Sequence, residues 1–247
     1  VLAQYRHMVT QILERAVALE VPGIVLEFEH LPPMTERPQW GEQITAQTRQ
    51  IMEEFHTRAG LAVALRVTPT DLRDANRPPR LRSGRELERM LESFRRCAQA
   101  GADILSIESI GGKELNDAAL LEGDLAGVIA GTAVLGARDM AFLWGEIVAI
   151  AKETGTMAGG DTACGFANTA MVLADRGMLP AVFAAAIRAL GAARTAVAHE
   201  QGAVGPTKDC AYEGPVLKAL FGVPISMEGK SAACAHLSHV GNVAAAC

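Results

Sequence analysis

Two cysteines and a glutamate stand where apolar segments give way to turns, and together they could bind a metal ion. Cys164 and Cys210 each lie in a glycine-containing turn, and Glu108 directly follows the apolar stretch 102–107. Thiolate sulfur and carboxylate oxygen both bind zinc, and three protein ligands leave the fourth position open for a substrate. Taken singly, a cysteine is more often a small buried apolar residue, so the spacing alone leaves both interpretations open.

Other polar residues stand close to these three in the sequence. Asp161 and Asp209 each lie within three residues of a candidate cysteine, where a carboxylate could orient a ligand or hold a substrate hydroxyl. Capping a helix N-terminus is an equally good role for either aspartate. We take Asp161 as the catalytic candidate. His30 and Arg66 follow or end apolar segments, and we expect both to line the same mouth.

A second group of metal-binding residue types competes with the first. Cys234, His236 and His239 lie close together, but on a helix Cys234 and His236 would point to different faces. Segment 222–231 has only the outline of a phosphate-binding loop, because Pro224 stands where that motif needs glycine. No GxGxxG follows an expected strand, and no GxSxG elbow is present.

The elements that must position these residues alternate between strand and helix. Expected strands, by apolar runs between turn signals, are 24–28, 61–67, 103–108, 156–158 and 223–227. Expected helices are 1–20, 43–58, 84–100, 138–154, 166–176, 180–201 and 213–221. Such alternation predicts about six parallel βαβ units. We expect one α/β domain over 1–247, a TIM-type (β/α) barrel that is incomplete in this chain, with a doubly wound sheet as the alternative.

Composition excludes some partners. The chain has 247 residues, a net charge of -5 and no cluster of Lys and Arg, so we expect neither nucleic acid nor a membrane as a partner. We see no apolar run long enough to span a bilayer and no signal peptide. Five cysteines without a short-range framework favour a reducing compartment, and we expect the cytoplasm.

The two ends of the sequence suggest a fragment. The chain opens at Val1 inside a helical pattern and stops at Cys247 after three alanines. We expect an internal piece of a longer protein, and a processed mature chain is the alternative.

Several segments together resemble one known family. They are 106–114, 160–164 with 167–171, 202–210 with 212–213, 228–230 and 234–236. The chain resembles, over essentially its whole length, the zinc-binding subunit of methanol:corrinoid methyltransferases. The resemblance implies a TIM barrel whose zinc is held by one Glu and two Cys, which correspond to Glu108, Cys164 and Cys210. Members of the family extend further at both ends.

The resemblance also implies a reaction and a partner. Methanol would give its methyl group to the Co(I) corrinoid of a separate protein, and zinc would stabilise the charge that develops on the alcohol oxygen. The sequence has no Asp-x-His-x-x-Gly motif of its own for a corrinoid, so we expect a corrinoid protein to dock over the barrel mouth in a homo- or hetero-oligomer.

Two other functions stay open. The methyl donor could be a methoxylated aromatic compound or a methylamine. Alternatively, the chain could be a non-catalytic partner subunit whose zinc only supports folding, with Cys234 or His236 as a fourth ligand.

Overall fold

Six parallel strands form one sheet in the computed structural model, which describes residues 2–107 and 109–161 together with 184, 197–200, 219, 222 and 225–227. The strands are β1 (Gly23–Glu29), β2 (Ala62–Thr68), β3 (Ile104–Ile107), β4 (Met157–Asp161), β5 (Val197–Glu200) and β6 (Ile225–Met227). Each strand pairs in parallel with the next one in the chain. A doubly wound sheet reverses its strand order, and the described strands show no reversal, so their order is that of part of a (β/α) barrel.

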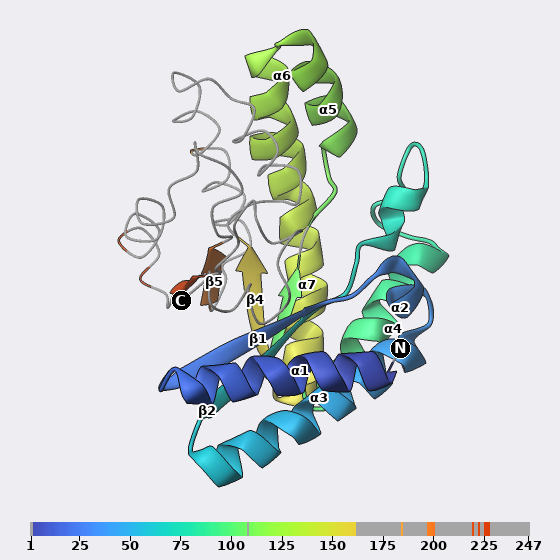
Figure 1. The fold of residues 1–247 in the computed structure, drawn as a ribbon. Coiled ribbons are helices and arrows are strands. Elements are labelled where there is room, and N and C mark those ends of the chain that lie inside the picture. Colours follow the sequence, from blue (N-terminus) through green and yellow to red (C-terminus); the bar gives the residue numbers. More distant parts are fainter. Residues whose placement is uncertain are drawn as a thin grey trace.

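Helices connect the first four strands (Figure 1). They are α1 (Leu2–Ala18), α2 (Pro32–Glu36), α3 (Pro38–Ala59), the 3-10 turn η1 (Leu72–Ala75), α4 (Arg85–Gln99), α5 (Lys113–Glu122), α6 (Leu125–Ile129), the π-helical segment η2 (Ala130–Gly136) and α7 (Ala137–Thr154). The α6, η2 and α7 segments run on as one long helix. In Figure 1, α5 and α6 extend beyond the carboxyl ends of the strands.

The core lies between the sheet and the helices that cover it. In α4, the buried residues Leu87, Met90, Phe94 and Cys97 recur every three or four positions, which gives the helix one apolar face. On β2, Leu65 belongs to the same core. Because side chains alternate along a strand, the neighbouring side chain of Arg66 points to the opposite face, which is the interior side of a barrel.

One predicted helix is wrong at its end. The expected helix 180–201 overlaps β5, which spans Val197–Glu200 and pairs with β4 on one side and with β6 on the other. The regular Ala and Arg spacing of this segment suits a helix, but pairing with two neighbouring strands decides the conformation here. Strand propensity depends on such context more than on the residues themselves.

The long helix also corrects the expectation about apolar runs. Leu125–Thr154 is long and apolar enough to cross a membrane by length and composition alone, with a mean hydropathy of 1.4 over its best window. Half of that window is buried inside the protein, and Met140, Leu143 and Ile147 belong to the core. Core helices of soluble proteins pass the same test, and the buried residues of α7 belong to the core beside the sheet.

Candidate functional site

The carboxyl ends of three neighbouring strands lead into the predicted metal ligands. Those ligands all lie outside the described residues: Glu108, Cys164 and Cys210. The last residue of β3, Ile107, directly precedes the first ligand, and β4 ends at Asp161, three residues before the second. β5 ends at Glu200, ten residues before the third. Because parallel strands end at the same edge of a sheet, the three segments all start from one edge.

Metal binding by other groups finds no support in the part of the chain that the structure describes. Within it, no group of three or more His, Cys, Asp or Glu side chains could hold a metal ion. The competing group of Cys234, His236 and His239 also lies outside that part. The backbone of Asp161 ends β4, level with His199 of β5.

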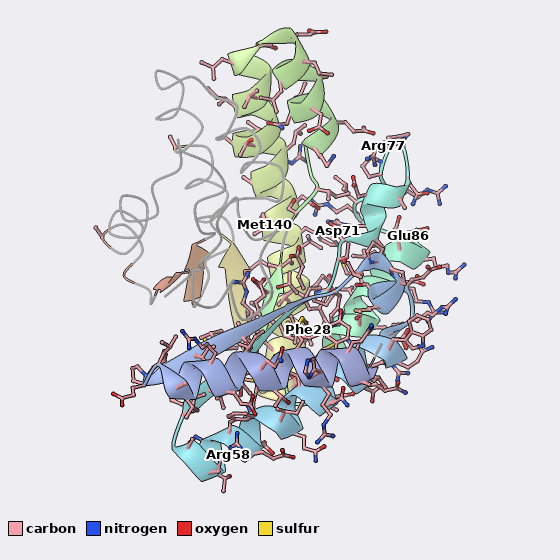
Figure 2. The ribbon with its side chains drawn as sticks, viewed as in Figure 1. Phe28, Arg58, Asp71, Arg77, Glu86 and Met140 are labelled. Carbon is pink, nitrogen blue, oxygen red and sulfur yellow. The ribbon has the colours of Figure 1, made fainter. Side chains whose placement is uncertain are left out.

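A largely buried ionic network lies beside the edge where β3 ends. The Arg73 guanidinium is 0% exposed and donates to both carboxylate oxygens of Asp139, at 2.9 and 2.8 Å. It also donates to both oxygens of Asp71, at 2.9 and 2.6 Å, and to the carbonyl oxygen of Leu81 at 2.7 Å. Figure 2 labels Asp71 beside α7, near Met140. Every N–H of the guanidinium therefore has an acceptor, which is what a buried cation needs.

The charges of this network hold the cation in place. Burial lowers the pKa of the Arg73 guanidinium, but the hydrogen bonds and charges of Asp71 and Asp139 outweigh burial and raise it overall. Burial raises the pKa of the Asp71 carboxyl, and the nearby charge of Asp139 adds to this, while Arg73 acts in the opposite direction. Two carboxylates thus share one guanidinium in a medium of low dielectric constant, where hydrogen bonds are strong.

The network reaches the loop that follows β3. Ser109 donates its hydroxyl to Oδ2 of Asp139 at 2.8 Å, and the backbone N–H of Gly111 donates to the same oxygen at 3.2 Å and to Oγ of Ser109 at 3.0 Å. A Cβ on Gly111 would run into the side chain of Asp139, and one on Gly112 would run into the backbone of Gly131. The loop is thus held against the long helix both by hydrogen bonds and by close backbone packing.

The loop between β2 and α4 is fixed to the same helix. Two of its arginines make contacts outside the buried network. Arg77 pairs with Asp74 at 2.9 Å and with Glu114 of α5 at 3.4 Å, and Arg82 stacks on the ring of Phe142 in α7. An open hollow of about 560 Å³ is lined by Glu86 of α4 and by this loop, through Asn76, Arg77, Pro78, Pro79 and Arg80. Figure 2 shows Arg77 and Glu86 on this side of the molecule. Arg77 and Arg82 therefore attach this loop to α5 and α7.

Comparison with known proteins identifies the family. The family model described as the methanol-cobalamin methyltransferase B subunit matches residues 1–247. The chain belongs to this family. It is 43% identical over 248 aligned residues to the methanol–corrinoid protein co-methyltransferase of Methanosarcina barkeri (strain Fusaro / DSM 804), an alignment that covers 99% of the chain and 53% of that relative. The resemblance inferred from the motifs is confirmed.

A solved structure supports the fold of this family member. The crystal structure of the methanol:cobalamin methyltransferase complex MtaBC from Methanosarcina barkeri matches with a TM-score of 0.78 and 39% identity, over 96% of this chain and 52% of that one. The expected α/β class with a parallel sheet is thereby confirmed. The chain spans about half the length of both relatives.

Polar side chains on β1, β2 and β3 of this chain face the barrel interior. Arg66, 1% exposed, pairs with Glu27 of β1 at 2.9 Å, and Thr68 donates its hydroxyl to the same carboxylate at 3.1 Å. On β3, the fully buried hydroxyl of Ser106 has no hydrogen-bond partner within the described part of the chain. The interior is therefore polar on these strands, and Arg66 is bound there by an ion pair.

The expectation that His30 lines the mouth is wrong. Its ring lies on the helix side of the sheet, with Nε2 3.9 Å from Sγ of Cys97 on α4, and a Cβ on Gly41 of α3 would lie 2.9 Å from Nδ1. Phe28 meets the ring edge-on at a centroid distance of 6.0 Å. Burial lowers the pKa of His30 to about 4 and raises the pKa of the Cys97 thiol to about 11. Both groups are thus neutral core residues near pH 7.

Sequence reasoning missed the buried network. Arg73 belongs to a polar stretch that looks like a solvated loop, and Ser109 looks like an ordinary turn residue. The available signal was Asp139, a carboxylate in the middle of a long apolar helix. Burying a charge on such a face is costly unless the charge is paired. Asp139 therefore indicates a buried cationic side chain from elsewhere in the chain.

Proposed function

We propose that this chain forms the zinc-binding part of an enzyme that activates methanol and transfers its methyl group to the corrinoid of a partner protein. The observation that carries the proposal is the family match over residues 1–247, in a chain whose β3, β4 and β5 lead into Glu108, Cys164 and Cys210. The matched relative is named as a methanol–corrinoid protein co-methyltransferase. The solved relative is a methanol:cobalamin methyltransferase complex, MtaBC, which supports a corrinoid protein as the partner.

The donor set fits zinc. Two thiolates and one carboxylate are ordinary zinc ligands, and with three of them one coordination position stays open. We propose one zinc ion per chain, held by Glu108, Cys164 and Cys210. When bound, zinc supplies Lewis acidity toward the methanol oxygen. We propose that Asp161, at the end of β4, holds the substrate hydroxyl in place.

We propose that the chain forms a single barrel domain and that the protein is cytoplasmic. All six belong to one sheet with sequential neighbours, and Cys97 is a free thiol, which suits a reducing compartment.

Metal analysis of the intact protein tests the ligand assignment. Cys164→Ala, Cys210→Ala and Glu108→Gln should each lose most of the zinc. Cys97→Ala is the matched control, because Cys97 is buried against His30 on the helix side of the sheet, and it should keep the zinc of the wild type. Full zinc retention in Cys164→Ala and Cys210→Ala would contradict the site.

A methyl-transfer assay tests the reaction. The intact protein, its reduced corrinoid partner and a panel of methanol, a methoxylated aromatic compound and a methylamine should give methyl transfer from methanol. Asp161→Asn should keep its zinc and lose rate. Transfer from another donor alone would replace methanol as the substrate, and zinc with four protein ligands and no transfer would identify a non-catalytic subunit.

A further inference from the structure

The loop that follows Glu108 is attached to α7 more firmly than a surface turn requires. Ser109 is 1% exposed and Asp139 is 1% exposed, and their hydrogen bond of 2.8 Å is supported by the Gly111 N–H. Charge-assisted hydrogen bonds of this kind are stronger than neutral ones. The residue on the other side of Glu108, Ile107, is 1% exposed and paired with Gly160 in the sheet. Both chain neighbours of Glu108 are therefore anchored.

Arg73 in turn holds the Asp139 carboxylate that binds this loop. The bidentate bond from the guanidinium fixes both carboxylate oxygens, so that Oδ2 faces Ser109 and Gly111. Asp71 in turn fixes the guanidinium from the β2 loop. Residues from two consecutive βα units, the one that begins with β2 and the one that begins with β3, thus meet at one buried charge cluster.

We propose that Arg73, Asp139 and Ser109 are positioning residues that fix the backbone next to Glu108 and thereby aim its carboxylate at the zinc ion. This inference rests on the proposed function, in which Glu108 is a zinc ligand. Groups that orient metal ligands contribute strongly to metal affinity, and their loss typically lowers it about 10- to 100-fold. A ligand whose neighbours can shift must be ordered each time the metal binds, which weakens binding.

The chain offers a matched control at the other end of the same strand. Asp103 precedes β3 and accepts from Arg49 at 2.7 Å and from the backbone N–H of Leu65 at 2.8 Å. Asp103→Asn therefore also disrupts a carboxylate that joins an arginine to the backbone, but at the amino end of the strand, away from Glu108. Any loss of zinc affinity that merely follows loss of stability should appear in this variant too.

The test is the zinc dissociation constant of the intact protein, measured by competition with a chelator, together with the melting temperature of each metal-free variant. Asp139→Asn and Ser109→Ala should weaken zinc binding by about 10- to 100-fold, while Asp103→Asn stays within about twofold of the wild type. Zinc X-ray absorption of Asp139→Asn should show a longer or missing carboxylate oxygen with both sulfurs retained. Ser109→Ala removes only a hydroxyl, with its bonds to Asp139 and to the Gly111 N–H, and leaves the Arg73–Asp139 ion pair in place. It therefore keeps the inference testable if Asp139→Asn does not fold.

Two outcomes would overturn the inference. The first is wild-type zinc affinity in folded Ser109→Ala and Asp139→Asn. The second is an equal loss of affinity in Asp103→Asn at an equal loss of melting temperature. Failure of the proposed function has a different signature, because Glu108→Gln would then bind zinc as the wild type does.

Discussion

Acid should destabilise this protein through His30 well before its carboxylates are protonated. The ring is 1% exposed and packed against Gly41 and Cys97, and its Nδ1 has no hydrogen-bond partner within the described part of the chain. Its folded-state pKa is lowered by burial from 6.5 to about 4. At a pH between these two values, His30 is mostly protonated in the unfolded chain and mostly neutral in the folded protein. The free energy of unfolding therefore falls as the pH falls.

The size of the effect follows from the two pKa values. One pKa unit corresponds to about 1.4 kcal/mol, so the whole gap is worth about 3 kcal/mol. The contribution is complete above the unfolded-state value of 6.5 and is lost progressively toward the folded-state value. About 2 kcal/mol of it should disappear between about pH 7.5 and about pH 5.

Urea unfolding of metal-free protein at these two pH values is the assay, with a chelator present so that loss of zinc does not contribute. His30→Leu removes the titrating group and fills the site with an apolar side chain, so its pH dependence should be flatter than that of the wild type by about 2 kcal/mol. Phe28→Leu is the control, because it alters the packing on the ring but keeps the imidazole. Parallel pH curves for the wild type and His30→Leu would refute the reasoning.

Three glycine substitutions test the close packing around these sites, each by urea unfolding. Gly41→Ala should cost about 1–3 kcal/mol from overpacking, because the new Cβ meets the ring of His30, and the His30→Ala background should relieve part of that cost; additive effects would contradict the contact. Gly112→Ala should destabilise more, since its φ is 84° and its Cβ would meet the backbone of Gly131. Gly145→Ala, in α7 with nothing within 4 Å of its Cβ, should instead stabilise by about 0.5–1 kcal/mol, and a loss of stability there would show that the helix is more closely packed than described.

The fold was largely predictable because its signals are local. Apolar runs flanked by turn residues located β1, β2, β3 and β6, and the helix expected over 84–100 corresponds to α4. β5 was not predictable, because Val197–Glu200 continues a helical pattern and becomes a strand only by pairing with both neighbours. Strand identity there is a property of the sheet.

The zinc site stays a prediction that rests on residue type, because two cysteines and a glutamate supply ligand atoms that zinc accepts. Residue type gives no comparable signal for a buried arginine. Arg73 and Asp139 are 66 residues apart, and nothing in either segment names its partner. The prediction for His30 was wrong because the sequence shows only that this residue follows a strand. It does not show which face of the sheet the side chain takes.

The burial of Arg73 also constrains the order in which the chain can fold. Its charge is neutralised by Asp71 from its own loop and by Asp139, which is contributed by the helix before β4. An intermediate holding only β1, β2 and their helices would have to keep the guanidinium in water or bury it half-paired, which is costly. The loop between β2 and α4 therefore reaches its native conformation only when β3 and α7 have packed against it. These two neighbouring βα units are expected to fold together in one cooperative step.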